Sequence, residues 1–258
     1  MIDILILILL AAAAFAAGYV NTVAGAGSLL ILPALIFSGL PANAANATNR
    51  VAILFQNIAA FGALRKGGVK LGKTTAIMTA IATIGSVGGA WVATRLTADQ
   101  TQAAIAVAMV VMLALSLVPS RKTAQDDASS GEPSVSWGLC AGFLLIGFYG
   151  GLLQAGVGIV ILLFLSLGFG TRLVVGNAIK LVVVLGFTLA ALAIFISASR
   201  GALIDPTRAT IIAVASSLGA WVGAKSTLKR GEKFIRTVVV VTVIASVIKL
   251  GIDLALKK

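Results

Sequence analysis

The sequence predicts an all-α polytopic membrane protein built from two inverted repeats, each with one broken-helix hairpin and three transmembrane helices, about eight to ten helical segments in all. Two observations carry this prediction. Of the 258 residues, 59% are hydrophobic and 11% are charged, whereas charged residues make up about a quarter of a soluble globular protein. The tetrapeptide Gly-Ala-Trp-Val also occurs twice, at residues 89–92 and 219–222, near the end of a long apolar segment each time. We therefore expect a duplicated domain surrounded by the lipid bilayer.

In the first half, an apolar run over residues 2–40 is interrupted at residues 21–28. We expect its start to be a retained helix, because Asp3 stands where a signal peptide carries Lys or Arg. At about 1.5 Å per residue the run is too long for one span, and each piece is short for a full crossing. A hairpin with an unwound tip fits, since glycines let the backbone turn and polar side chains bond the opened peptide groups. Apolar segments follow at residues 45–64, 74–94 and 103–118.

The second half repeats this plan. Its apolar run over residues 137–168 is interrupted at residues 150–158. Its further apolar segments lie at residues 173–197, 209–224 and 238–256. Between the halves, a stretch rich in Ser, Asp, Glu and Pro is typical of a loop. We therefore divide the chain into a first transmembrane repeat (1–118), a cytoplasmic linker (119–136) and a second transmembrane repeat (137–258).

The distribution of Lys and Arg predicts how the repeats are oriented. If the hairpins contribute an even number of crossings, twelve bases share the side of the linker and five lie on the other side. If each broken run crosses once, the same bases divide ten to seven. Cytoplasmic loops are enriched in Lys and Arg, so the first arrangement is favoured. It places the linker in the cytoplasm and both termini outside the cell (inner) membrane, and it makes the repeats inverted.

Two basic residues stand inside apolar segments at matching places. Arg50 lies early in the segment at 45–64, and Lys180 lies 130 residues later in the corresponding segment. A charge at the centre of a membrane helix costs ~2.5 to 3.5 kcal/mol on insertion scales, so such residues point to function. Snorkelling to lipid headgroups is the alternative explanation. Recurrence in both repeats, among clustered amides, favours a site.

The expected site is a pocket for an anion. Helical spacing places Asn46, Arg50 and Asn57 on one face of their helix. The helix that restarts after each break points its positive dipole end and free N–H groups toward the same region. The two bases would supply charge, the amides hydrogen bonds and the glycines backbone N–H groups. The predicted substrate-binding residues are Asn21, Thr22, Gly25, Gly27, Ser28, Asn46, Thr48, Asn49, Arg50, Gln154, Gly156, Gly158, Asn177 and Lys180.

Other function classes are disfavoured by the composition. The chain contains no His, and its eight acidic residues fall in loops or near segment ends. Proton relays and cation sites commonly use buried carboxylates or His. The sequence also shows no catalytic triad, paired carboxylates or phosphate-binding loop. We expect no enzyme activity, no cofactor, no metal and no nucleic-acid partner. A coupling ion, H⁺ or Na⁺, and a homodimer are left open.

Several features, taken in order along the chain, resemble one known family. They are the Gly-rich break within residues 18–28, the Pro33 helix ending in Ser-Gly-Leu-Pro at 38–41, the Ala-Thr-Asn segment at 47–49, the loop at 65–71 and the paired Gly-Ala-Trp-Val ends. Together they look like the sulfite exporter TauE/SafE family of membrane permeases, over nearly the whole chain. The resemblance implies a transporter of small anions such as sulfite, sulfoacetate or related organosulfonates and carboxylates.

The preferred function is therefore a secondary transporter or exporter of small anions, which works by alternating access between the repeats. An anion channel, in which the same bases line a pore, is the alternative. A third hypothesis is a membrane scaffold that holds other helices on seams of small residues. Trp91 and Trp221 are expected to be interfacial anchors. The small residues expected to form the seams are Gly85, Gly89, Ala93, Ala215, Gly219 and Gly223.

Overall fold

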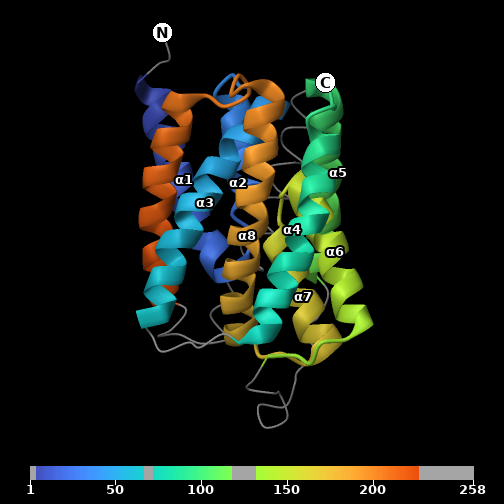
Figure 1. Ribbon diagram of the computed structural model, residues 1–258. Coiled ribbons are helices and arrows are strands. Elements are labelled where there is room, and N and C mark those ends of the chain that lie inside the picture. Colours follow the sequence, from blue (N-terminus) through green and yellow to red (C-terminus); the bar gives the residue numbers. More distant parts are fainter. Residues whose placement is uncertain (1–3, 67–71, 118–131, 227–258) are drawn as a thin grey trace.

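The computed structural model describes residues 4–66, 72–117 and 132–226, and this part of the chain is a bundle of helices (Figure 1). A helix over residues 206–226, called the 206–226 helix below, lies beside α1 at the edge of the bundle. The predicted segment at 238–256 and residues 119–131 of the predicted linker lie outside the described residues. The other helices are α1 (Ile4–Ala24), α2 (Ser28–Phe37), α3 (Ala42–Lys66), α4 (Lys73–Ala93), α5 (Ala98–Leu117), α6 (Trp137–Leu152), α7 (Val157–Phe169) and α8 (Leu173–Ser199).

The all-helical fold expected from the apolar segments is confirmed, and both long apolar runs are interrupted. The interruptions are narrower than predicted. Helix α1 continues to Ala24, and α6 continues to Leu152. The chain turns only at residues 25–27 and 153–156, because Gly25 and Gly156 adopt the left-handed backbone (φ 74° and 67°) that glycine accepts without strain. Polar residues that precede these turns stay helical.

Three helices are long and apolar enough to cross a membrane, judged by length and composition: Ile4–Ala24, Lys73–Ala93 and Val174–Ser199. Of the pieces of the broken runs, α2, α6 and α7 are shorter apolar helices, as predicted, whereas α1 is long enough to span, so the expectation that every piece is short was wrong for α1. Large apolar side chains cover the outer surface of the bundle; Ile84 and Leu145 are 68% and 70% exposed. Such a surface is suited to lipid and costly in water. Length, composition and surface together fit a polytopic membrane protein.

Corresponding helices of the two halves run in opposite directions. In Figure 1, α1 and α3 descend from the end of the bundle at which α1 begins, whereas α6 and α8 ascend toward that end. Likewise α4 ascends and the 206–226 helix descends. The short α2 and α7 follow the two interruptions.

Seams of small residues hold α4 against α6 and the 206–226 helix against α1. A Cβ atom on Gly89 would overlap the carbonyl of Phe148, and one on Gly219 would overlap the carbonyl of Phe15. The same applies to Gly85, which faces the α6 backbone. These contacts confirm that the predicted small residues let helices pack backbone to backbone.

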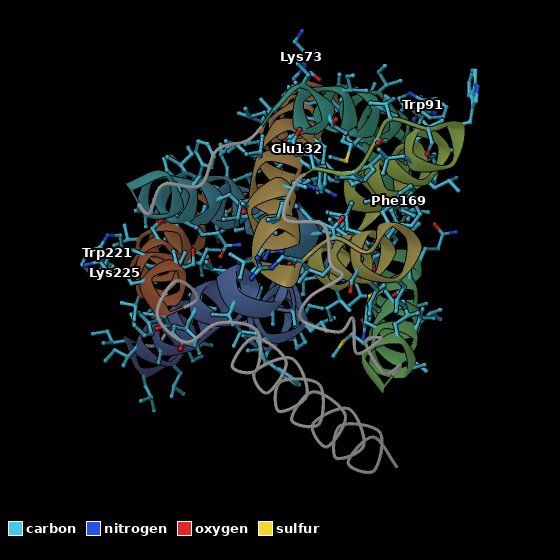
Figure 2. The ribbon with its side chains drawn as sticks, turned by 90° about the horizontal axis from the view of Figure 1, so that it is seen from below. Lys73, Trp91, Glu132, Phe169, Trp221 and Lys225 are labelled. Atoms are coloured by element: carbon cyan, nitrogen blue, oxygen red, sulfur yellow. The ribbon has the colours of Figure 1, made fainter. Side chains whose placement is uncertain are left out.

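Each of the two repeated tryptophans stacks on the base four residues later. The Arg95 guanidinium lies 4.7 Å from the Trp91 ring centroid, and the Lys225 ammonium lies 3.4 Å from that of Trp221. Both rings are about half exposed, and they lie on separate sides of the bundle in Figure 2. Since α4 and the 206–226 helix run in opposite directions, the two pairs lie toward opposite ends. This position fits aromatic anchors at two membrane interfaces.

Glu132, which lies in the predicted linker, caps the start of α4. The Glu132 carboxylate accepts hydrogen bonds from the Gly72 N–H, at 2.5 Å, and from the Thr75 hydroxyl, at the start of α4 (Figure 2). A negative charge at a helix N-terminus also interacts favourably with the helix dipole. We expect Glu132→Ala to lower the free energy of unfolding by about 1 kcal/mol, measured as a lower melting temperature in detergent. Glu132→Gln, which keeps an acceptor without charge, should lose less; an unchanged melting temperature for Glu132→Ala would contradict this role.

Candidate functional site

The first interruption touches the first turn of α7, which directly follows the second interruption, in the interior of the protein; this contact is called the crossing of the two interruptions below. A Cβ atom on Gly25 would overlap the backbone of Gly158, and a Cβ on Gly158 would overlap the backbone of Gly25. Main chain therefore touches main chain where the first hairpin meets the second. Gln154, in the second interruption, has a positive φ of 59°, which is uncommon for a residue with a side chain.

Arg50 extends from α3 to the C-terminal end of α6. Its guanidinium donates to the carbonyls of Gly150 at 3.1 Å and Gly151 at 2.5 Å, and to Gln154 Oε1 at 3.4 Å. The guanidinium carbon also lies 4.5 Å from the ring centroid of Phe195. The side chain is fully buried. Because the last carbonyls of a helix lack partners and carry its negative dipole end, Arg50 satisfies and neutralises the end of α6.

Lys180 satisfies the C-terminal end of α1, as Arg50 satisfies that of α6. It extends from α8, and its ammonium donates to the carbonyls of Asn21 at 2.7 Å and Thr22 at 3.2 Å, in the last turn of α1. The side chain is 1% exposed. The base of each half thus binds the broken helix of the other half. Neither base reaches lipid headgroups by snorkelling.

Buried amides surround these contacts. Asn46 donates to the Leu152 carbonyl at 2.9 Å, and Gln154 donates to the Thr188 hydroxyl at 2.5 Å. Asn49 and Asn177 are buried, and neither side-chain atom of either residue has a hydrogen-bond partner among the described residues. Buried polar atoms in native proteins are nearly always bonded to protein, water or a ligand. These two amides are therefore suited to hold molecules from solution.

A small cavity lies beside the crossing point, on the Lys180 side. Its volume is about 10 Å³, measured as the space open to the centre of a water-sized sphere. This is roughly the volume that one water molecule needs. Arg50 does not line it. The polar and charged lining residues are Asn21, Ser28, Asn57, Gln154 and Lys180, and the others are Ile53, Val157, Gly158 and Val184.

Some predicted site residues lie elsewhere or are occupied. Thr48 does not line the cavity, and its hydroxyl accepts a hydrogen bond from the Asp205 N–H at 3.1 Å. The Gly25 N–H donates to the Asn21 carbonyl at 2.9 Å. Gly27 is packed against the Ala17 carbonyl, and Gly156 against Met112. These positions serve packing and turn formation in this conformation.

Two polar residues of the site are absent from the predicted set. Asn57 lines the cavity, and its position seven residues after Arg50, on the same helix face, was a usable signal. Thr188 orients Gln154 from two turns beyond Lys180. Among the residues that the structure describes, no group of three or more Cys, Asp or Glu could hold a metal ion.

Comparison with known proteins identifies the family of this chain. The family model for the sulfite exporter TauE/SafE matches residues 10–250. "Probable membrane transporter protein ORF9" of Sinorhizobium sp is 28% identical over 245 residues, covering 93% of this chain and 90% of the relative. "Probable membrane transporter protein YfcA" of Escherichia coli K12 is 28% identical over 243 residues, covering 93% and 88%. No solved structure gives a significant match. The chain belongs to the sulfite exporter TauE/SafE family of membrane transporters.

Proposed function

We propose that this transporter carries small anions, such as sulfite, sulfoacetate or related organosulfonates and carboxylates, across the inner membrane by alternating access. The observation that carries the proposal is the cavity beside the crossing of the two interruptions, where Lys180 is a buried base. A cation in low-dielectric surroundings attracts an anion strongly. The N-terminal turn of α7, represented by Val157 and Gly158, adds the positive end of a helix dipole to the lining.

The two bases have different roles in this proposal. Arg50 is engaged with two carbonyls and the Gln154 amide and does not line the cavity. It positions α6 and Gln154. Lys180 lines the cavity and donates two of its N–H groups to carbonyls of α1. An ammonium at this position therefore has a third N–H for a ligand. We therefore assign the substrate charge contact to Lys180, with Asn21, Ser28 and Asn57 beside it.

The size of the cavity favours a carrier over a pore. Space for about one water molecule is too small for sulfite or a sulfonate, so the helices have to separate before such an anion enters. Opposite running directions of corresponding helices support inverted repeats, and such repeats typically rock against each other around a central site. The charge distribution supports a cytoplasmic linker and external termini.

Anion binding tests the proposal. The purified protein in detergent is titrated calorimetrically with sulfite, sulfate, sulfoacetate and short carboxylates. Lys180→Met should weaken binding of the preferred anion by about 10- to 100-fold, because a hydrogen bond to a charged group contributes roughly 1.5 to 3 kcal/mol. Lys225→Met removes a surface base that stacks on Trp221 and should leave the affinity unchanged.

Two results would count against the proposed site or function. Full affinity in folded Lys180→Met would place the anion elsewhere. Failure of every anion in the series to bind the wild-type protein would reject the proposed substrate class. Monodisperse elution of each variant shows that a loss of binding is not a loss of fold.

A further inference from the structure

Lys180 is the one titratable residue among those that line the cavity. The lining from α1, α2, α3, α7 and the turn before α7 consists of Asn, Ser, Gln, Gly and aliphatic residues. The described acids lie elsewhere: Glu132 caps α4, Asp205 pairs with Arg208, and Asp99 begins α5. Without a bound anion, the described cavity lining therefore offers Lys180 no counter-charge.

The neighbouring helices carry few other groups that titrate. Arg50 is directed at α6 and Phe195. Tyr149, on α6, donates its hydroxyl to the Ala155 carbonyl. Tyr19 is on α1, two residues before the Asn21 carbonyl that Lys180 contacts. The guanidinium of Arg50 stays protonated in proteins, so it is not suited to exchange a proton.

We propose that Lys180 couples transport to protons, taking up one proton with each anion and releasing it with that anion on the other side. The inference rests on the proposed function, to which it adds the coupling ion. The two carbonyls that Lys180 contacts can accept hydrogen bonds from either its neutral amine or its protonated ammonium form. A neutral amine satisfies them with its two N–H groups and keeps its lone pair, while an ammonium satisfies them and directs a third N–H toward the anion.

The proton balance of the cycle is simple. Water on the side to which the cavity opens supplies the proton, which binds the lone pair of the Lys180 amine as the anion enters. The occupied cavity then holds one positive charge of the protein beside the charge of the anion, which lowers the cost of enclosing either alone. After reorientation the anion leaves, and the ammonium returns its proton to water on that side.

Proteoliposomes loaded with radiolabelled sulfoacetate test the inference in two assays, with the membrane potential held at zero by valinomycin and potassium. The first measures exchange of sulfoacetate at equal concentrations without a pH gradient, and it requires only the proposed function. The second measures accumulation driven by an acidic exterior. For one proton per anion, wild-type protein should accumulate sulfoacetate about tenfold per pH unit, since about 1.4 kcal/mol corresponds to a factor of ten.

Lys180→Arg separates the two activities. Arginine supplies N–H donors for the α1 carbonyls and an anion but keeps its proton, so anion exchange should be reduced but measurable, whereas pH-driven accumulation should be lost. Lys180→Gln, with two N–H donors and no exchangeable charge, should also fail to accumulate. Lys225→Arg, a change of the same type at the surface, should behave as wild type in both assays.

Each outcome decides a different point. Accumulation by Lys180→Arg or Lys180→Gln at the wild-type level would overturn the inference. Wild-type exchange without accumulation, or without proton entry reported by a pH dye trapped in the vesicles, would overturn it and leave the proposed function standing. Absence of wild-type exchange would reject sulfoacetate as a substrate and the coupling with it. If Lys180→Arg exchanges no anion, the trapped pH dye tests the inference instead. It should report proton entry with the wild-type protein and no proton entry with Lys180→Gln.

Discussion

Gly158→Ala should prevent the protein from reaching its folded, monodisperse state. The new Cβ would overlap the backbone of Gly25, and no side-chain rotation can relieve a clash between main-chain segments. Overpacking a core costs about 1 to 3 kcal/mol when side chains can adjust, so a fixed backbone contact should cost at least the upper end of that range. The measurement is the yield of monodisperse protein in detergent and its melting temperature.

Gly168→Ala is the matched control on the same helix. Gly168 belongs to α7, and a Cβ at this position has no neighbour within 4 Å. Alanine is preferred over glycine in a helix by about 0.5 to 1 kcal/mol, so this variant should be as stable as wild type or slightly more stable. If Gly158→Ala were equally well folded, the close crossing of the two interruptions would not be required for the native state.

Arg50→Met should also destabilise the protein severely. Methionine fills much of the volume but leaves the carbonyls of Gly150 and Gly151 and the Gln154 side-chain oxygen without their donor in a buried place. Each unsatisfied buried polar group costs about 1 to 3 kcal/mol, so the three together should lower the free energy of unfolding by at least about 3 kcal/mol. Thermal unfolding in detergent measures it, and anion exchange should fall together with the folded fraction.

Arg50→Lys is the conservative comparison. One ammonium can still reach a carbonyl, but it lacks the planar fork that bonds two adjacent acceptors, so an intermediate loss of stability is expected. A different pattern would change the assignment of roles. If Arg50→Met had the wild-type melting temperature but bound no anion, Arg50 would contact the substrate instead of positioning α6.

Most of the fold could be predicted from the sequence because lipid permits few backbone solutions. Each predicted apolar segment within the described residues is helical, and Gly85, Gly89 and Gly219 form the expected seams. The width of the interruptions was not predictable in the same way. Asn21 and Thr22 have polar side chains, yet their backbone stays helical, and the turn follows at Gly25. Polar residues supply hydrogen bonds, but backbone torsion decides where a helix ends.

The candidate site was predictable in part. Recurrence of a base in corresponding apolar segments singled out Arg50 and Lys180, and the structure shows both to be buried at the crossing of the halves. Their partners could not be found by pattern, because they are backbone carbonyls 100 and 159 positions away in the chain. Every residue has a carbonyl, so no residue type marks these acceptors. Thr48 is hydrogen-bonded to the Asp205 N–H and does not line the cavity, since neighbours in sequence on a helix face different ways.

The contact between Gly25 and Gly158 has a mechanical consequence. Interlocking side chains resist sliding, because each must leave its slot before two surfaces can shift. The contact between Gly25 and Gly158 joins two glycine backbones and has no side chains that could interlock. A rotation of one hairpin against the other would therefore not require any side chains to separate at this contact.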